Sequence, residues 1–141
     1  GSALIEAIMG EVRPAFLQLH GNESLERIAA IRSLSKTSII KAVKVAGPED
    51  ISAARAYEPA AEILLFDAAP SAAPGALPGG NGISFDWTWL SGASLRPNFM
   101  LSGGLNPGNV LAALRASGAS AVDVSSGVET SPGVKSPELI R

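Results

Sequence analysis

An alternation of short apolar runs with helical patterns is the feature that most constrains the fold of this chain. The runs are rich in β-forming residues and are expected to be strands; they cover residues 15–19, 39–45, 62–66, 99–101 and 121–124. Intervening helices favour parallel pairing, because parallel neighbours need a crossover connection. The runs alternate little with polar residues, as expected when both faces of a sheet are covered. The sequence therefore predicts an α/β fold.

Apolar spacing and capping signals predict helices over residues 3–12, 24–34, 47–57 and 106–118. Ser24 is expected to be the N-cap of the second helix, and Pro48 stands at the first position of the third. In the last helix Asn106 is the predicted N-cap, Pro107 lies inside it and Gly118 stops it. The first helix has no strand ahead of it. A crossover helix without its incoming strand suggests that the sequence begins in the middle of a β/α fold.

Length and charge bound the class of function. The 141 residues, 46% hydrophobic and 17% charged, suit one domain over 1–141. Gly1-Ser2 is read as a cloning scar or a native start. A net charge of -2 and a pI near 5.4 argue against nucleic acid or an anionic membrane as the main partner. No apolar run reaches the roughly 18 residues of a membrane span, and no signal peptide is recognised, so we expect a cytoplasmic protein.

The absence of cysteine limits the covalent, metal-binding and catalytic chemistry open to this chain. None of the 141 residues is Cys, which removes disulfides, thiolate metal sites and any thiol nucleophile or base from this chain. We expect no metal site.

A long segment interrupts the alternation of predicted strands and helices. Residues 67–90 are rich in Pro, Gly and Ala, and they should form a long loop after the carboxyl end of a strand. Such loops carry lids and active-site residues in parallel folds. The alternative is a plain surface excursion.

Polar residues that follow strands are the candidate functional residues, because ligands bind at the carboxyl edge of parallel sheets. Asp67 should be partly desolvated, so that it holds its proton more tightly and suits a general acid; alternatively it caps a turn. His20 is the one histidine, and lone histidines are more often structural. Asp123 is expected inside a strand, where an unpaired buried carboxylate would be costly. The full set is Gln18, His20, Asp67, Ser102, Gly103, Gly104, Asp123, Ser125, Ser126 and Gly127.

Two glycine-rich turns are more informative together than apart. SGGL and SSGV follow the last two strands, and glycine lets the backbone approach an anion closely. A single Gly-Gly at a strand end is mostly turn geometry. Two such turns on consecutive strands match the phosphate site that β/α barrels form after their last two strands.

Five motifs carry a resemblance to a known family: LQLHG, LLFDA, GGNGISFDW, LSGGLNPGNV and VDVSSGVETSPGVK, in this order. They resemble the C-terminal two-thirds of phosphoribosylanthranilate isomerase, an enzyme family of tryptophan biosynthesis, through nearly the whole chain. That family is a single-domain (β/α)8 TIM barrel. The resemblance implies a truncated barrel that covers strands four to eight.

The resemblance also implies an activity, the Amadori rearrangement of N-(5'-phosphoribosyl)anthranilate to a carboxyphenylamino-deoxyribulose phosphate, without a cofactor. Asp67 is then the general acid, and the backbone of the glycine-rich turns holds the phosphate. In the family the general base is a cysteine at the end of the first strand, which this chain lacks. Residues implied to bind the phosphosugar are Gln18, His20, Ser102, Gly103, Gly104, Asp123, Ser125, Ser126 and Gly127.

Two other functions stay open beside the isomerase. One is a catalytically inactive barrel fragment that binds phosphosugars but lacks the base. The other is a complete flavodoxin-like binding domain with five strands. A barrel without three strands would expose two sheet edges, so we expect either a homo-oligomer that pairs these edges or an N-terminal segment missing from the sequence.

Overall fold

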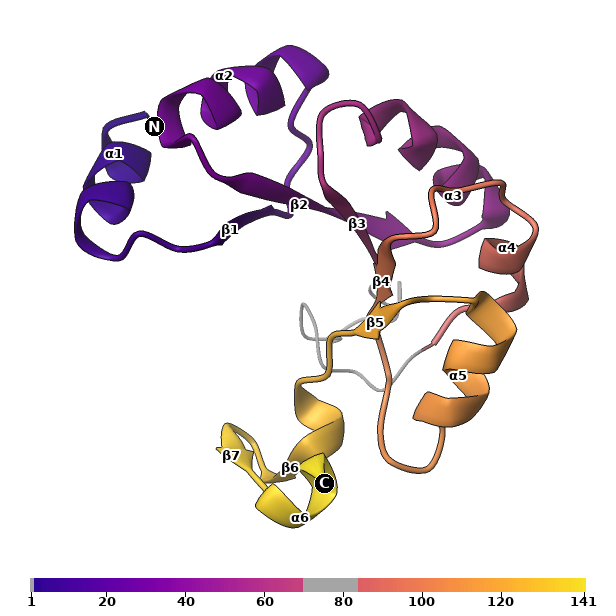
Figure 1. The fold of residues 1–141 in the computed structure, drawn as a ribbon. Helices are drawn as coiled ribbons and strands as arrows, with labels where there is room; N and C mark the ends of the chain where they lie inside the picture. The colour runs from indigo at the N-terminus through magenta and orange to yellow at the C-terminus, as the bar shows by residue number, and fades with distance from the viewer. Residues whose placement is uncertain (1, 70–83) are drawn as a thin grey trace, which may run out of the picture.

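The computed structural model describes residues 2–69 and 84–141, and its centre is a five-stranded parallel sheet (Figure 1). The strands are β1 (Phe16–Leu19), β2 (Ser38–Val45), β3 (Ile63–Ala68), β4 (Phe99–Leu101) and β5 (Ala121–Val122). They lie side by side in sequence order, and every neighbouring pair is parallel. The α/β class and the five strands are confirmed, with ends that differ from the prediction by at most two residues.

The strand order contradicts the flavodoxin-like alternative. That fold places its first strand between the second and third and covers both faces of the sheet with helices. Here the order is sequential, and the helices lie on the convex side of a sheet that curves like an arc (Figure 1). A sheet curved in this way, with helices outside, is barrel-like.

Helices and a small hairpin complete the chain. The α-helices are α1 (Ser2–Glu11), α2 (Leu25–Ser35), α3 (Pro48–Ala54), α4 (Thr88–Ser91), α5 (Val110–Ser117) and α6 (Pro137–Ile140). Two 3-10 turns are η1 (Arg55–Tyr57) and η2 (Ser126–Val128), and the antiparallel hairpin pairs β6 (Glu129–Ser131) with β7 (Val134–Lys135). No described helix is long and apolar enough to cross a membrane.

The predicted helix starts are right for two helices. The Ser24 hydroxyl accepts a hydrogen bond from the Arg27 amide at 3.2 Å, as an N-cap does. Helix α3 begins at Pro48, and the Asp50 carboxylate accepts from the Gly47 amide at 3.1 Å. This helix ends at Ala54, however, and the rest of the predicted span is η1.

The predicted start of the last long helix is wrong. The Asn106 side chain accepts from the Gly108 amide at 2.9 Å and closes a turn, so α5 begins only at Val110, after Asn109. Its end at Gly118 is confirmed, because this residue adopts φ 74° and its amide donates to the Leu114 carbonyl at 2.9 Å.

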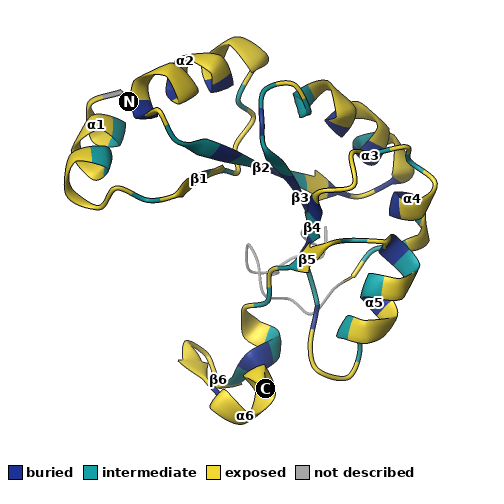
Figure 2. Ribbon diagram, in the orientation of Figure 1, coloured by how far each residue is buried: buried dark blue, intermediate teal, exposed yellow. Residues whose placement is uncertain are grey.

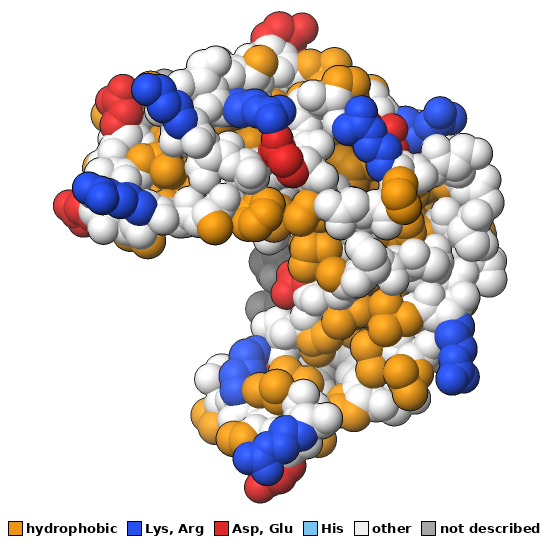
Figure 3. All heavy atoms as spheres, in the orientation of Figure 1, with side chains coloured by type: hydrophobic (Ala, Val, Ile, Leu, Met, Phe, Trp, Pro, Cys, Tyr) orange, Lys and Arg blue, Asp and Glu red, His pale blue; other side chains and the backbone are white. Residues whose placement is uncertain are grey.

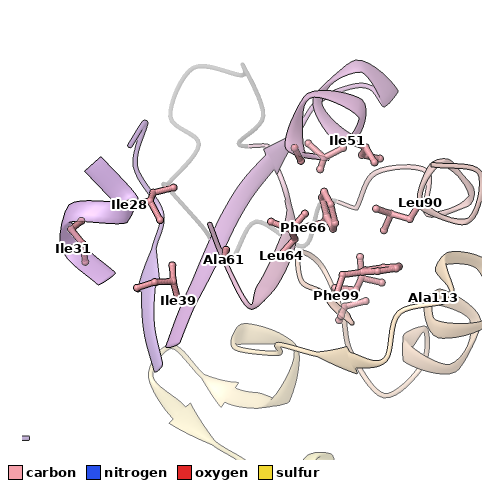
Figure 4. Packing of buried hydrophobic residues seen from close by; sticks show 14 residues of the cluster. Ile28, Ile31, Ile39, Ile51, Ala61, Leu64, Phe66, Leu90, Phe99 and Ala113 are labelled. Carbon is pink, nitrogen blue, oxygen red and sulfur yellow. The ribbon is translucent and has the colours of Figure 1, made fainter. Parts of the chain in front are cut away.

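The apolar core lies between the sheet and the helices (Figure 4). Phe66 of β3 is fully buried and meets Phe99 of β4 edge to face, with ring centroids 5.7 Å apart. In Figure 2 buried residues lie where the inner strands and the helices face each other, and a further buried stretch lies beside β6. Covering of both faces was predicted for all strands but does not hold for β1, which has no fully buried residue and whose Phe16 is 44% exposed.

The predicted long loop is only partly described. Asp67 belongs to β3, and the segment ends in α4, so the loop is shorter than residues 67–90. Residues 70–83 lie outside the described part of the chain.

Candidate active site

A cavity of about 430 Å³ opens at the carboxyl ends of β3, β4 and β5. Figure 3 shows the molecule hollowed on the concave side of the arc. The cavity brings together most of the residues that the sequence singled out: Asp67, Ser102, Gly103, Gly104, Asp123, Ser125, Ser126 and Gly127. Leu105, Val124 and Glu129 are the other described residues of its lining.

Asp67 lies inside β3 rather than after it, and it stands opposite Lys44 in the register of β2. The Lys44 ammonium donates a hydrogen bond to Asp67 Oδ2. The Asp67 side chain is 26% exposed and that of Lys44 is 45% exposed. The partly buried carboxyl expected here is found, with an ion-pair partner that the sequence reasoning missed.

The first glycine-rich turn brings the end of β4 close to the end of β3. Gly103 and Gly104 have φ values of 90° and 66°, a region that side chains other than glycine rarely adopt. A Cβ at Gly103 would lie 2.6 Å from the Ala68 nitrogen and 2.9 Å from Asp67 Oδ1. Glycine is therefore needed here for both the backbone conformation and the packing of the Asp67 carboxyl.

The second glycine-rich turn packs against the first. A Cβ at Gly127 would lie 1.7 Å from the Leu105 carbonyl oxygen, so the two backbones are in direct contact. Lys135 of β7 fixes this turn, since its ammonium donates to the Ser125 carbonyl at 2.9 Å and to Glu129 Oε1 at 2.5 Å. The hydrogen bond from Lys135 lowers the pKa of Glu129 below its usual value, helped by the Gly133 amide.

Asp123 departs from its prediction. The strand β5 ends at Val122, so Asp123 follows it, with its amide donating to the Leu101 carbonyl at 2.9 Å. Its side chain is exposed rather than buried in a strand. The expected cost of an unpaired buried carboxylate therefore does not arise.

His20 and Gln18 do not line the main cavity. His20 lines a smaller hollow of about 180 Å³ at the ends of β1 and β2, together with Lys44 and Tyr57. Gln18 lies on β1, is exposed, and is absent from the described lining of both spaces. Lys44 lines the small hollow and pairs with Asp67 of the large cavity, so it stands between the two.

The loop after His20 is held by a buried lysine. Lys41 of β2 has a side chain only 3% exposed; its ammonium donates to the Gly21 carbonyl at 2.5 Å and pairs with Glu23 Oε2 at 2.8 Å. Burial tends to raise the pKa of Glu23, but hydrogen bonds from Lys41 and the Gly21 amide lower it overall. The signal that could have revealed Lys41 and Lys44 is two lysines within the apolar strand IIKAVKV.

Potential metal ligands do not cluster among the residues that the structure describes. Within residues 2–69 and 84–141, no group of three or more His, Cys, Asp or Glu side chains could hold a metal ion.

Comparison with known proteins identifies the family. The family described as N-(5'phosphoribosyl)anthranilate (PRA) isomerase matches residues 2–141. The chain belongs to this family. The resemblance to this family that the five motifs suggested is therefore confirmed.

Relatives of the phosphoribosylanthranilate isomerase family match in sequence and in structure. A curated N-(5'-phosphoribosyl)anthranilate isomerase from Rhodospirillum centenum is 53% identical over 137 residues, which are 97% of this chain and 64% of the relative. A crystal structure of the Thermotoga maritima protein matches with a TM-score of 0.81 and 36% identity, over 99% of this chain and 64% of that one. A further isomerase, crystallised with reduced 1-(o-carboxyphenylamino)-1-deoxyribulose 5-phosphate, matches with a TM-score of 0.77 and 33% identity, over 99% of this chain and 62% of that one.

These likenesses show that the curved parallel sheet has the arrangement of phosphoribosylanthranilate isomerase structures. The chain spans 64% of the length of the Rhodospirillum centenum relative. The truncated barrel stays a prediction.

Proposed function

We propose that this chain catalyses the Amadori rearrangement of N-(5'-phosphoribosyl)anthranilate to the carboxyphenylamino-deoxyribulose phosphate. The observation that carries the proposal is one cavity that combines the Asp67 carboxyl with the glycine-rich turns after β4 and β5. Membership of the phosphoribosylanthranilate isomerase family gives that cavity its substrate class.

Each part of the cavity has a role in this proposal. The backbone of the turns at Gly103-Gly104 and Ser126-Gly127 holds the phosphate, with Ser102 and Ser125 beside it, because glycine allows a close approach of the backbone to an anion. Asp123 borders the sugar. Gln18 and His20 lie farther along the same sheet edge and face the rest of the substrate.

The chemistry needs an acid and a base. Asp67 protonates the ring oxygen of the ribose, and the ring opens to a Schiff base. A base then removes the C2′ proton, and the resulting enolamine gains a proton at C1′ and loses its C2′ hydroxyl proton to become the ketone. The electrons lost by C2′ are gained by C1′, so the rearrangement is an internal oxidation and reduction.

A second candidate function follows from the missing thiol. The 141 residues contain no cysteine, the residue type that serves as the base in this family. The alternative is therefore a fragment that binds phosphosugars at the same turns without turning them over.

We further propose that the five strands correspond to strands four to eight of a closed barrel. Among the described residues, β1 and β5 each pair with one neighbour only. Such edges favour either a homo-oligomer or completion by an N-terminal segment. We place the protein in the cytoplasm, with a small phosphosugar as its partner.

The test is loss of phosphoribosylanthranilate fluorescence with the 141-residue chain and with Asp67→Asn. Loss of a general acid typically costs about 100-fold or more in rate, so turnover that collapses in Asp67→Asn supports the proposal. Equal turnover in both chains would show that Asp67 is not the acid. No turnover, with ribose 5-phosphate still bound in calorimetry, supports the binding fragment.

A further inference from the structure

The charge of the cavity is unexpected for a phosphate site. Asp67, Asp123 and Glu129 line it, and no lysine, arginine or histidine is among the described lining residues. A phosphorylated ligand meets like charges there, and such repulsion weakens binding. Two lysines reach the lining carboxylates from outside: Lys135 pairs with Glu129 at 2.5 Å, and Lys44 pairs with Asp67.

Lys44 and Gly103 together fix the Asp67 carboxyl group. Lys44 and Asp67 are register partners on β2 and β3, and the ammonium of Lys44 binds Oδ2. The other oxygen, Oδ1, packs against Gly103, where an added Cβ would lie 2.9 Å away. The carboxyl group is thus held between a cation on one side and a glycine backbone on the other.

We propose that Lys44 is a positioning residue for Asp67 and that, as Lys135 does at Glu129, it offsets a lining carboxylate so that this acidic cavity can accept a phosphosugar. It acts through Asp67 and does not contact the ligand. Lys41, the other lysine of β2, is buried and paired with Glu23, so it cannot take over this role. The inference rests on the proposed phosphosugar binding and does not require turnover.

The test is a double-variant cycle with ribose 5-phosphate as the probe, measured by calorimetry at low ionic strength. Lys44→Met leaves the Asp67 charge unpaired beside the ligand, and we expect affinity to fall about threefold to tenfold. Lys44→Arg keeps the charge and should bind as the wild type does. In the Asp67→Asn background the same Lys44→Met change should have little effect, because the charge that Lys44 offsets is gone.

A matched control separates local charge from net charge. Lys36→Met removes one positive charge at the C-cap of α2, outside both lined spaces, and should leave affinity unchanged. Lys44 is 45% exposed, so its replacement should preserve the fold, which circular dichroism verifies.

Two results would overturn the inference: unchanged affinity in Lys44→Met, or an equal loss with and without the Asp67 carboxylate. If the wild type binds no ribose 5-phosphate, phosphosugar binding and this inference both fail. If the cycle behaves as expected while no variant shows turnover, the inference stands and only the isomerase activity fails.

Discussion

The turns after β4 and β5 and the loop after β1 share one edge of the sheet but are held by different forces. Gly103 and Gly127 allow backbone contacts so close that a single methyl group would not fit. The loop after His20 is instead held by the buried ammonium of Lys41 and the Glu23 carboxylate. The comparison indicates that close backbone contacts, supplemented by the Lys135 ammonium at the second turn, shape the proposed phosphate end of the site, whereas a buried ion pair shapes the other end.

The largest effect should come from Gly127→Ala. The new Cβ would lie 1.7 Å from the Leu105 carbonyl oxygen, and neither backbone can rotate away as a side chain could. We expect a loss of about 3 kcal/mol in the free energy of unfolding, measured with urea, together with loss of ribose 5-phosphate binding. Gly92→Ala is the matched control, because nothing lies within 4 Å of its added Cβ. An equal, small effect in both variants would refute the steric account.

Lys41→Met should have the next largest effect, at the other end of the edge. The methionine keeps the apolar stem but leaves Glu23 without its cation and the Gly21 carbonyl without its donor. Because Glu23 is partly exposed, we expect a loss of about 2 kcal/mol, less than the roughly 3–5 kcal/mol typical of a broken, fully buried pair. Lys36→Met, at an exposed site, serves as the control. A stability equal to that of the control would mean that packing alone holds this loop.

The smallest expected effect is a difference in how the free energy of unfolding depends on pH. It distinguishes the loop after β1 from the glycine-rich turns. The folded state lowers the pKa of Glu23 below its ordinary value of 4.5, so its contribution is present above that value and is lost as pH falls through the lowered pKa. The stability difference between the wild type and Glu23→Gln should therefore shrink below pH 4.5. The destabilisation by Gly127→Ala should stay constant over the same range, because it is steric. Urea unfolding of these chains from pH 7 to pH 3 makes the comparison; a difference for Glu23→Gln that does not change with pH would contradict it.

Local sequence signals determined the elements of the fold. Apolar runs located the strands to within two residues, and Ser24, Pro48 and Gly118 marked helix ends where the structure has them. These signals work because a capping side chain or a left-handed glycine acts within a few residues of chain. The start of α5 was misplaced because Asn106 serves a turn as readily as a helix cap.

The glycine-rich turns and Asp67 were found from the sequence, because residues at the carboxyl ends of parallel strands converge wherever the sheet is parallel. Only the tertiary structure showed that Gly127 contacts Leu105, that Asp67 pairs with Lys44 and that His20 lies in a separate hollow. These facts depend on strand register and on the distance between neighbouring turns. One residue of slip would turn Lys44 to the opposite face of the sheet. The sequence by itself determined which residues reach the edge, whereas packing between distant segments decided which of them touch.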